Sequence, residues 1–238
     1  MHLSLPMKQS TNLYESQALR AVTGPAIRPG GLALTERALA LCGLTAGARV
    51  LDVGCGGGAT VAHLRQSHGL RAMGLDLSWM LLAEGRAQPG CPPLVQGPAE
   101  MLPVADGKLQ AIFCECVLSL LSSPKSALAE WHRALAPGGL LVVSDLYARA
   151  GQLEDELFSA PGRCCLAGAV DRDTLLEGVT GAGFEVVVFE DHSPLLKQLA
   201  AQLVWAYGSL ETFRARAGLG CTSHGNGRPG YYLMVAKK

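Results

Sequence analysis

The chain has 238 residues, of which 49% are hydrophobic and 17% charged, so it is long enough for a folded domain and too apolar for a disordered protein. Twenty Lys and Arg residues balance twenty Asp and Glu residues, and a net charge of zero leaves little general attraction for a polyphosphate backbone. Collagen-like and disordered classes are therefore excluded, and no nucleic-acid partner is expected.

Strands and helices are predicted to alternate from residue 49 onward, from apolar β-rich runs and from helical periodicity with capping residues. The first half of the pattern is a strand at 49–53, a helix at 59–68, a strand at 70–75, a helix from the cap Ser78 to Arg86, short strands at 94–96 and 111–114, and a helix from Pro124 to about Leu135. The second half is a Pro-Gly-Gly turn at 137–139, a strand at 140–144, a helix at 174–182, a strand at 184–189, one long amphipathic helix at 195–216 and a strand at 231–236.

This alternation predicts an α/β fold, doubly wound, in which helices cover both faces of a mostly parallel sheet. Residues 1–48 are expected to form an N-terminal cap, followed by a single domain over 49–238 with a loop insertion at 146–170. Trp131 and Trp205 lie in helical patterns and are expected in the core. Ligands of such folds bind at the carboxyl ends of the strands, so the cap and the insertion are expected to cover that cleft.

The most informative stretch follows the first strand and is rich in glycine. The segment VLDVGCGGGA at 50–59 places glycines between a strand and a helix, where backbone N–H groups point at a ligand. Gly54, Gly56 and Ala59 satisfy G-x-G-x-x-G/A, and Asp76 has the spacing of a ribose-binding acid, so an NAD-dependent oxidoreductase is one hypothesis. Asp52 argues against it, because a buried carboxylate repels a pyrophosphate and attracts a ligand with an ammonium and a sulfonium group.

Asp52, the glycine loop and the segment GLDLS at 74–78 resemble the first two signature motifs of the class I S-adenosylmethionine-dependent methyltransferases, and the resemblance continues through GPAEMLP at 97–103 and DGKLQAIF at 106–113. It implies a Rossmann-like fold with a seven-stranded sheet. It also implies that S-adenosyl-L-methionine donates a methyl group to a small-molecule substrate and leaves as S-adenosyl-L-homocysteine. The cofactor-binding residues implied are Asp52, Gly54, Cys55, Gly56, Asp76, Leu77, Ala99, Glu100 and Cys116.

The same resemblance implies a role for several of these positions. Asp52 would hold the amino group of the cofactor, the glycine loop would admit its methionine portion, Asp76 would bind both ribose hydroxyls, and the backbone around Ala99 and Glu100 would meet the adenine edge. Cys116 follows Cys114 by two residues. Because side chains alternate along a strand, both thiols are expected on one face, with Cys116 near the carboxyl end beside the cofactor.

Three cysteines in expected loops suggest a narrower resemblance. Cys165 in the segment CLAGA and Cys221 before the last strand are similar to the arsenic-binding cysteines of arsenite methyltransferases, and Cys164 doubles the first of them. The resemblance implies a thiol-bound metalloid such as arsenite as substrate, because a soft trivalent metalloid prefers thiolates. The chain departs from that family at Glu115, where an asparagine is expected, and in having no cysteine in residues 1–41.

The sequence identifies no catalytic residue firmly. A thiolate or metalloid acceptor needs no general base, whereas an oxygen or nitrogen acceptor does, and Glu115 and His192 are the candidates. Arg28 is a candidate for contacting the substrate. No H-x-x-E-H or C-x-x-C pair marks a metal site, and His63 and His68 are interpreted as solvated or satisfied helix residues.

Three hypotheses therefore stay open: a methyltransferase, an NAD-dependent oxidoreductase, and a non-catalytic protein that binds a metalloid through thiols. The segment from Met1 to Gln9 has no basic stretch followed by an apolar one, and the most apolar window, 195–210, contains Lys197 and two glutamines. We expect a cytoplasmic monomer or homodimer without a membrane partner, in which the eight cysteines are thiols.

Overall fold

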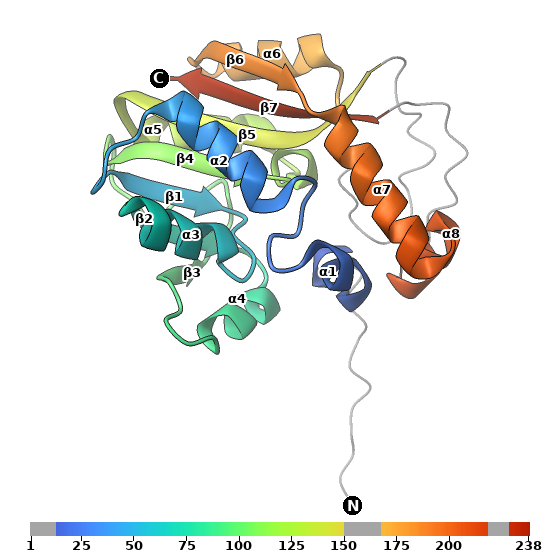
Figure 1. The fold of residues 1–238 in the computed structure, drawn as a ribbon. Coiled ribbons are helices and arrows are strands. Elements are labelled where there is room, and N and C mark those ends of the chain that lie inside the picture. The colour runs from blue at the N-terminus through green and yellow to red at the C-terminus, as the bar shows by residue number, and fades with distance from the viewer. Residues whose placement is uncertain (1–12, 150–167, 219–228) are drawn as a thin grey trace, which may run out of the picture.

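The computed structural model describes residues 13–149, 168–218 and 229–238, which form a sheet with helices packed around it (Figure 1). Within these residues the sheet has seven strands in the order β3-β2-β1-β4-β5-β7-β6. The strands are β1 (Arg49–Val53), β2 (Arg71–Asp76), β3 (Leu94–Gln96), β4 (Leu109–Glu115), β5 (Leu135–Ala148), β6 (Glu185–Asp191) and β7 (Pro229–Lys237). The helices are α1 (Gln17–Thr23), α2 (Gly31–Cys42), α3 (Ala59–His68), α4 (Trp79–Arg86), α5 (Pro124–Ala134), α6 (Arg172–Gly181), α7 (Ser193–Tyr207) and α8 (Leu210–Arg216), with the 3-10 turns η1 (Leu13–Glu15) and η2 (Leu118–Leu120).

The sheet separates two hydrophobic layers, because successive side chains of a strand point to opposite faces. On one face Leu51 and Ile112 pack with Trp131 of α5, and α6 extends the same layer. On the other face Val50 and Phe113 pack with α2 and α3. Strands β1 to β5 pair in parallel, while β7 runs antiparallel between β5 and β6. The predicted doubly wound, mostly parallel sheet is confirmed.

A third, smaller cluster joins segments from distant parts of the sequence. Leu13 and Leu19 pack with Leu203 of α7 and Phe213 of α8, and the Tyr207 hydroxyl donates to the Ala18 carbonyl at 2.8 Å. Helix α1 consequently lies beside α7 and α8 at one end of the sheet (Figure 1). We call η1, α1, α7 and α8 the cap cluster.

Strand β5 is longer than the sequence predicts. The predicted start of the loop at residue 146 is wrong, because β5 runs from Leu135 to Ala148 and contains the predicted turn at 137–139, where Gly138 has a φ of 75°. At its start, a register shift against β4 between Leu109 and Ala111 accommodates the turn residues inside the strand. At its end, pairing with β7 continues to Ala148 opposite Pro229, so the backbone stays extended. Only 150–167 of the expected insertion lie outside the described residues.

The predicted long helix at 195–216 is also wrong, since α7 ends at Tyr207 and α8 begins at Leu210. Gly208 adopts a φ of 82°, and the Ser209 hydroxyl caps α8 by accepting a hydrogen bond from the Thr212 N–H at 3.0 Å. The expected burial of Trp205 is wrong as well, because its side chain is 92% exposed on α7. Trp131, in contrast, is fully buried as expected.

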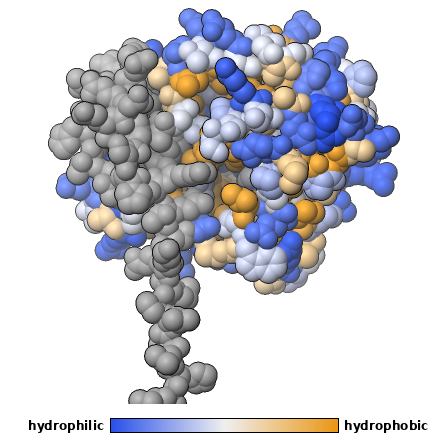
Figure 2. All heavy atoms as spheres, turned by 180° about the vertical axis from the view of Figure 1, so that it is seen from behind, coloured by the Kyte–Doolittle hydropathy of each residue, from blue (hydrophilic) through white to orange (hydrophobic). Residues whose placement is uncertain are grey.

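The surface of the described residues mixes hydrophilic and hydrophobic areas. Seen from behind, hydrophilic side chains predominate and hydrophobic ones form scattered areas between them (Figure 2). Among the residues described, no helix has both the length and the apolar character that a membrane span requires.

Candidate functional site

A cavity of about 530 Å³ lies at the carboxyl ends of β1, β2 and β4. The strand order reverses between β1 and β4, which is the switch point where ligands of doubly wound folds bind. Segments 52–56, 75–78, 97–100 and 115–117 line the cavity, and Arg28 and its neighbours close it from the N-terminal side. The cavity therefore lies where the sequence predicted a cleft.

The glycine loop between β1 and α3 forms one wall of this cavity. Gly54 has a φ of 76°, and a Cβ atom there would lie 2.1 Å from Cγ2 of Val117, so only glycine fits. The N–H groups of Gly54 and Cys55 donate to the Leu75 carbonyl at 2.7 and 3.1 Å. These bonds hold the loop against the end of β2 and leave its backbone facing the cavity.

Asp76, the last residue of β2, is fixed by the backbone on both sides. Its Oδ2 atom accepts the Gly56 N–H at 2.7 Å, and its Oδ1 atom accepts the Ser78 N–H at 2.7 Å. Burial raises the pKa of this carboxyl, and the two backbone hydrogen bonds oppose the rise. Each oxygen keeps a second lone pair, so Asp76 can still accept a hydrogen bond from a ligand in the cavity.

Asp52 is a buried acidic group of the site that lacks hydrogen-bond donors. It is 3% exposed, and within the part of the chain that the structure describes no group donates a hydrogen bond to its carboxylate. Burial raises the pKa of Asp52 well above its ordinary value, nearby Glu115 raises it further, and Arg28 opposes both. A cationic group of a ligand would offset this cost.

A buried ion pair lies beneath Asp52. The Arg28 Nη2 atom lies 2.8 Å from Oε2 of Glu115, and its side chain also donates to the hydroxyls of Thr35 and Thr60. The two hydroxyls in turn donate to Oε1 and Oε2 of Glu115, each at 3.0 Å. The Nε atom of Arg28 is buried and has no hydrogen-bond partner among the residues that the structure describes. We call Arg28, Thr35, Thr60 and Glu115 the buried network; it links the N-terminal segment, α2, α3 and β4.

Cys116 has an unusual backbone at the end of β4. Its φ is 59°, and its Sγ atom lies 3.2 Å from the Tyr231 hydroxyl. The expectation that Cys114 and Cys116 share a face is wrong: Cys114 packs in the layer of Ile112 and Cys116 in the layer of Phe113. Because the backbone of Cys116 is left-handed, the alternation of side chains along β4 ends there. The Cys116 thiol consequently lies on the opposite face of the sheet from that of Cys114. Burial raises the pKa of the Cys116 thiol, so it lies on the cavity wall as a neutral group.

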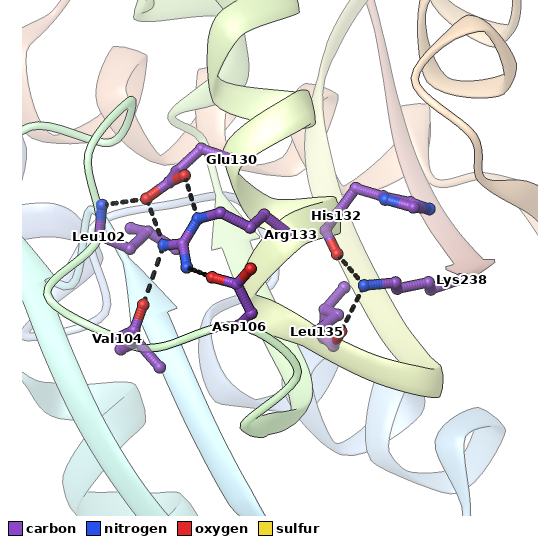
Figure 3. Close-up of polar contacts among 8 residues, drawn as sticks. All are labelled: Leu102, Val104, Asp106, Glu130, His132, Arg133, Leu135 and Lys238. Carbon is purple, nitrogen blue, oxygen red and sulfur yellow. Dashed lines mark hydrogen bonds and ion pairs between the residues drawn. The ribbon is translucent and has the colours of Figure 1, made fainter.

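The loop after β3 is fixed by helix α5. The Trp131 Nε1–H donates to the Ala99 carbonyl at 2.9 Å, which fixes the loop where Ala99 lines the cavity. Further along the loop, a guanidinium of α5 bridges two carboxylates and a backbone carbonyl, and one of these carboxylates accepts a backbone N–H of the loop (Figure 3). The residues of this network are Leu102, Val104, Asp106, Glu130 and Arg133.

The structure brings the predicted cofactor-binding residues together. The residues that line the cavity include Asp52, Gly54, Cys55, Gly56, Asp76, Leu77, Ala99, Glu100 and Cys116. Of the two candidate bases, Glu115 lines the cavity and is ion-paired with Arg28, while His192 does not line it and its Nε2 lies 2.9 Å from Oε2 of Glu190. Cys164, Cys165 and Cys221 lie outside the described residues.

Thr35 and Thr60 of the buried network were not predicted from the sequence. Thr60 lies in the first turn of the helix after the glycine loop, and this position next to the motif is a sequence signal for it. Thr35 lies in the middle of α2, far from any motif, and no sequence signal points to it.

Comparisons with known proteins agree with this geometry. Residues 51–143 match the family model described as a methyltransferase domain. The chain is 30% identical over 182 residues to an uncharacterized methyltransferase of Synechocystis sp., covering 73% of this chain and 78% of that protein. It is 36% identical over 101 residues to a malonyl-[acyl-carrier protein] O-methyltransferase of Enterobacter lignolyticus, covering 42% of this chain but only 40% of that relative.

Two solved structures show the same fold. Phosphoethanolamine N-methyltransferase 2 of Haemonchus contortus, in complex with S-adenosyl-L-methionine, superposes with a TM-score of 0.74 at 20% identity, over 93% of this chain and 56% of that one. The [4+2]-cyclase SpnF superposes with a TM-score of 0.68 at 25% identity, over 87% of this chain and 80% of that one. The fold thus occurs with more than one kind of reaction.

Proposed function

Because this chain belongs to the methyltransferase-domain family of the class I S-adenosylmethionine-dependent methyltransferases, we propose that it transfers a methyl group from S-adenosyl-L-methionine to a small-molecule acceptor. One observation carries the proposal. The cavity at the strand switch point combines Asp52, a buried carboxylate that accepts no hydrogen bond from the described residues, with Arg28, a buried guanidinium whose Nε has no hydrogen-bond partner among those residues.

The residues of the cavity fit this cofactor. An amino-acid portion carries an ammonium and a carboxylate, which complement Asp52 and Arg28 in charge. The lone pairs of Asp76 that the backbone leaves open complement ribose hydroxyls. A cavity of about 530 Å³ also lies within the range of roughly 300–1,000 Å³ that small-molecule and cofactor sites occupy.

The chain contributes binding and orientation. S-adenosyl-L-methionine supplies an electrophilic methyl group bound to a sulfonium. The glycine loop and the loop fixed by Trp131 give the cavity rigid walls, and Val117, Leu120 and Leu121 exclude water from part of it. Good orientation of reacting groups in a rigid site lowers a barrier by as much as about 7–11 kcal/mol. We assign no general base, because Glu115 is held by the buried guanidinium of Arg28 and by two hydroxyls within the buried network.

The acceptor is proposed only as a small molecule. The names of the Enterobacter lignolyticus relative and of the Haemonchus contortus structure give two different acceptors, a malonyl-[acyl-carrier protein] and phosphoethanolamine. The match covers only 40% of the first of these and 56% of the second, so neither acceptor is assigned to this chain. A thiol-bound metalloid stays a hypothesis that rests on Cys164, Cys165 and Cys221. It predicts that arsenite raises the melting temperature, and that Cys165→Ser and Cys221→Ser each abolish this rise while leaving cofactor binding intact.

A thermal-shift panel tests the proposed function. We expect S-adenosyl-L-homocysteine to raise the melting temperature, because a ligand that binds only the folded state stabilises it by mass action, and NADH to leave it unchanged. Stabilisation by NADH alone would overturn the proposal in favour of an oxidoreductase. Since a cyclase shares this fold, the second measurement is formation of S-adenosyl-L-homocysteine from S-adenosyl-L-methionine with a panel of acceptors.

The variant Asp52→Asn tests the observation that carries the proposal. It removes a buried charge without changing shape, so we expect a higher melting temperature for the ligand-free protein, by about 2–4 °C for each kcal/mol of burial cost removed. We expect the same variant to lose most of the stabilisation by S-adenosyl-L-homocysteine. Asp173→Asn on the exposed surface of α6 is the matched control and should retain it. A full ligand shift in Asp52→Asn would contradict the assignment.

A further inference from the structure

We propose that Glu36, His63 and His68 bind a divalent transition-metal ion that fastens α2 to α3. Glu36 lies on α2 and both histidines on α3, and one ligand atom from each of the three residues lies within 4.8 Å of the other two. This site is separate from the cavity, and none of its residues lines that cavity.

The geometry of the three side chains matches a metal site. The Nε2 atoms of both histidines contact the same oxygen, Oε1 of Glu36, with the His68 contact at 2.8 Å. The two rings meet edge to face with centroids 5.3 Å apart. Two imidazoles and one carboxylate are a donor set that holds Zn²⁺ in proteins, with a fourth position left for water. A metal ion would replace the present imidazole–carboxylate contacts with bonds to the same atoms.

The surroundings of the site support binding in two further ways. The Ser67 hydroxyl lies 3.3 Å from Nδ1 of His63, so it can orient that ring while Nε2 faces the metal. The side chains are also reachable from solvent, with exposed fractions of 47% for Glu36, 20% for His63 and 31% for His68. An ion therefore has an entry path, as a metal site requires.

The position of the site gives it a structural consequence. Thr35 precedes Glu36 on α2, and Thr60 lies three residues before His63 on α3. Both threonines belong to the buried network, which joins the same two helices on their inner side. A metal ion bound by Glu36, His63 and His68 would add a second link between α2 and α3, on their solvent-exposed side. We therefore expect the metal to stabilise the ligand-free fold without any requirement for the cofactor.

Titration of the chelator-treated full chain with Zn²⁺ and Co²⁺ tests the proposal. Zn²⁺ at about a hundred times its dissociation constant should raise the melting temperature by several °C. Glu36→Gln, His63→Gln and His68→Gln should each weaken binding at least about tenfold. Glu177→Gln removes an exposed carboxylate of α6 and is the matched control, which should bind as the wild type does.

Cysteine thiols are the main alternative ligands for the added metal ion, since the chain has eight cysteines. Co²⁺ separates the two cases, because thiolate ligands produce intense near-ultraviolet charge-transfer bands and imidazole with carboxylate does not. We expect visible d–d bands without those thiolate bands, lost in each of the three variants. The proposal is overturned by no metal-induced stabilisation, by equal stabilisation of wild type and all three variants, or by thiolate bands at the first equivalent. Melting curves without metal show that each variant is folded.

Discussion

At the scale of single residues, burial decides the chemistry of the acidic groups around the cavity. Asp52 on β1 and Asp145 on β5 are each almost fully buried, on strands that β4 separates, yet their surroundings differ. Asp145 accepts hydrogen bonds from the Ser119 N–H and hydroxyl and from the Leu146 N–H, at 2.9, 2.7 and 2.7 Å. Asp52 accepts none from the described residues. Asp145 is therefore a structural group that anchors η2, whereas we propose that Asp52 is a binding group whose partner is a cationic group of the cofactor.

Asp145 should give the protein a measurable pH dependence. Burial raises its pKa to about 6, against an ordinary value of 3.8. The folded state therefore binds this proton more tightly than the unfolded state, so the contribution of Asp145 to stability grows as the pH falls from about 6 to about 4. An asparagine has only one side-chain oxygen, so Asp145→Asn cannot accept all three of these hydrogen bonds. The variant should therefore be less stable than the wild type over the whole range from about pH 4 to pH 7. Its deficit relative to the wild type should be larger at pH 4 than at pH 7 by about 2 kcal/mol.

Urea unfolding of both proteins at pH 4, 5, 6 and 7 measures this difference. Other titrating groups cancel because they occur in both proteins. Stability curves of wild type and Asp145→Asn that run parallel over this range would show that Asp145 does not titrate as described.

At the scale of the elements, local residues start and stop the helices while neighbouring strands determine the strand lengths. Ser78 caps α4 and Asp171 caps α6 through side-chain oxygens that accept N–H groups of the first turn. The glycine loop between β1 and α3 is the element on which the cavity depends, because Gly54 combines a left-handed backbone with close contact to Val117.

Gly54→Ala should therefore be costly. The left-handed backbone costs about 1–2 kcal/mol for a residue with a Cβ, and the contact with Val117 adds about 1–3 kcal/mol of overpacking. Gly107→Ala is the matched control, since Gly107 has a φ of 65° and a Cβ there would meet nothing within 4 Å. We expect only Gly54→Ala to lose stabilisation by S-adenosyl-L-homocysteine in a thermal shift. Equal stability losses in the two variants would show that the contact with Val117 costs nothing.

At the scale of the whole molecule, the N-terminal segment is attached to the sheet by polar and apolar contacts together. The ion pair between Arg28 and Glu115 has side chains only 7% and 4% exposed, and it joins residues 87 positions apart in the sequence. The cap cluster holds α1 against α7 and α8. Neither contact alone closes the cavity, which needs the N-terminal segment, the helices and the sheet in one arrangement.

A double-mutant cycle on this ion pair tests how the segment is held. Arg28→Met and Glu115→Leu should each cost about 3–5 kcal/mol, because each leaves one buried charge without its partner. The double variant should cost clearly less than the sum of the two, since neither charge remains. The free energy of unfolding of the ligand-free proteins measures the cycle. Additive losses would mean that the two charges do not stabilise each other.

The sequence alone determined the order in which strands and helices alternate along the chain from residue 49 onward. It also determined the glycine loop and the positions of Asp52 and Asp76, because these features depend on local periodicity and on short motifs. The nine residues predicted around a cofactor meet at one cavity because parallel strands bring their carboxyl ends to one edge. Only the tertiary structure decided the length of β5 and the exposure of Trp205, whereas the break after Tyr207 has a local cause in Gly208 and the cap Ser209. The tertiary structure also revealed the buried network and the contacts of Glu36 with His63 and His68. The physical reason is that these features depend on which residues, distant in the sequence, pack together and are buried from solvent. A local sequence pattern does not contain this information.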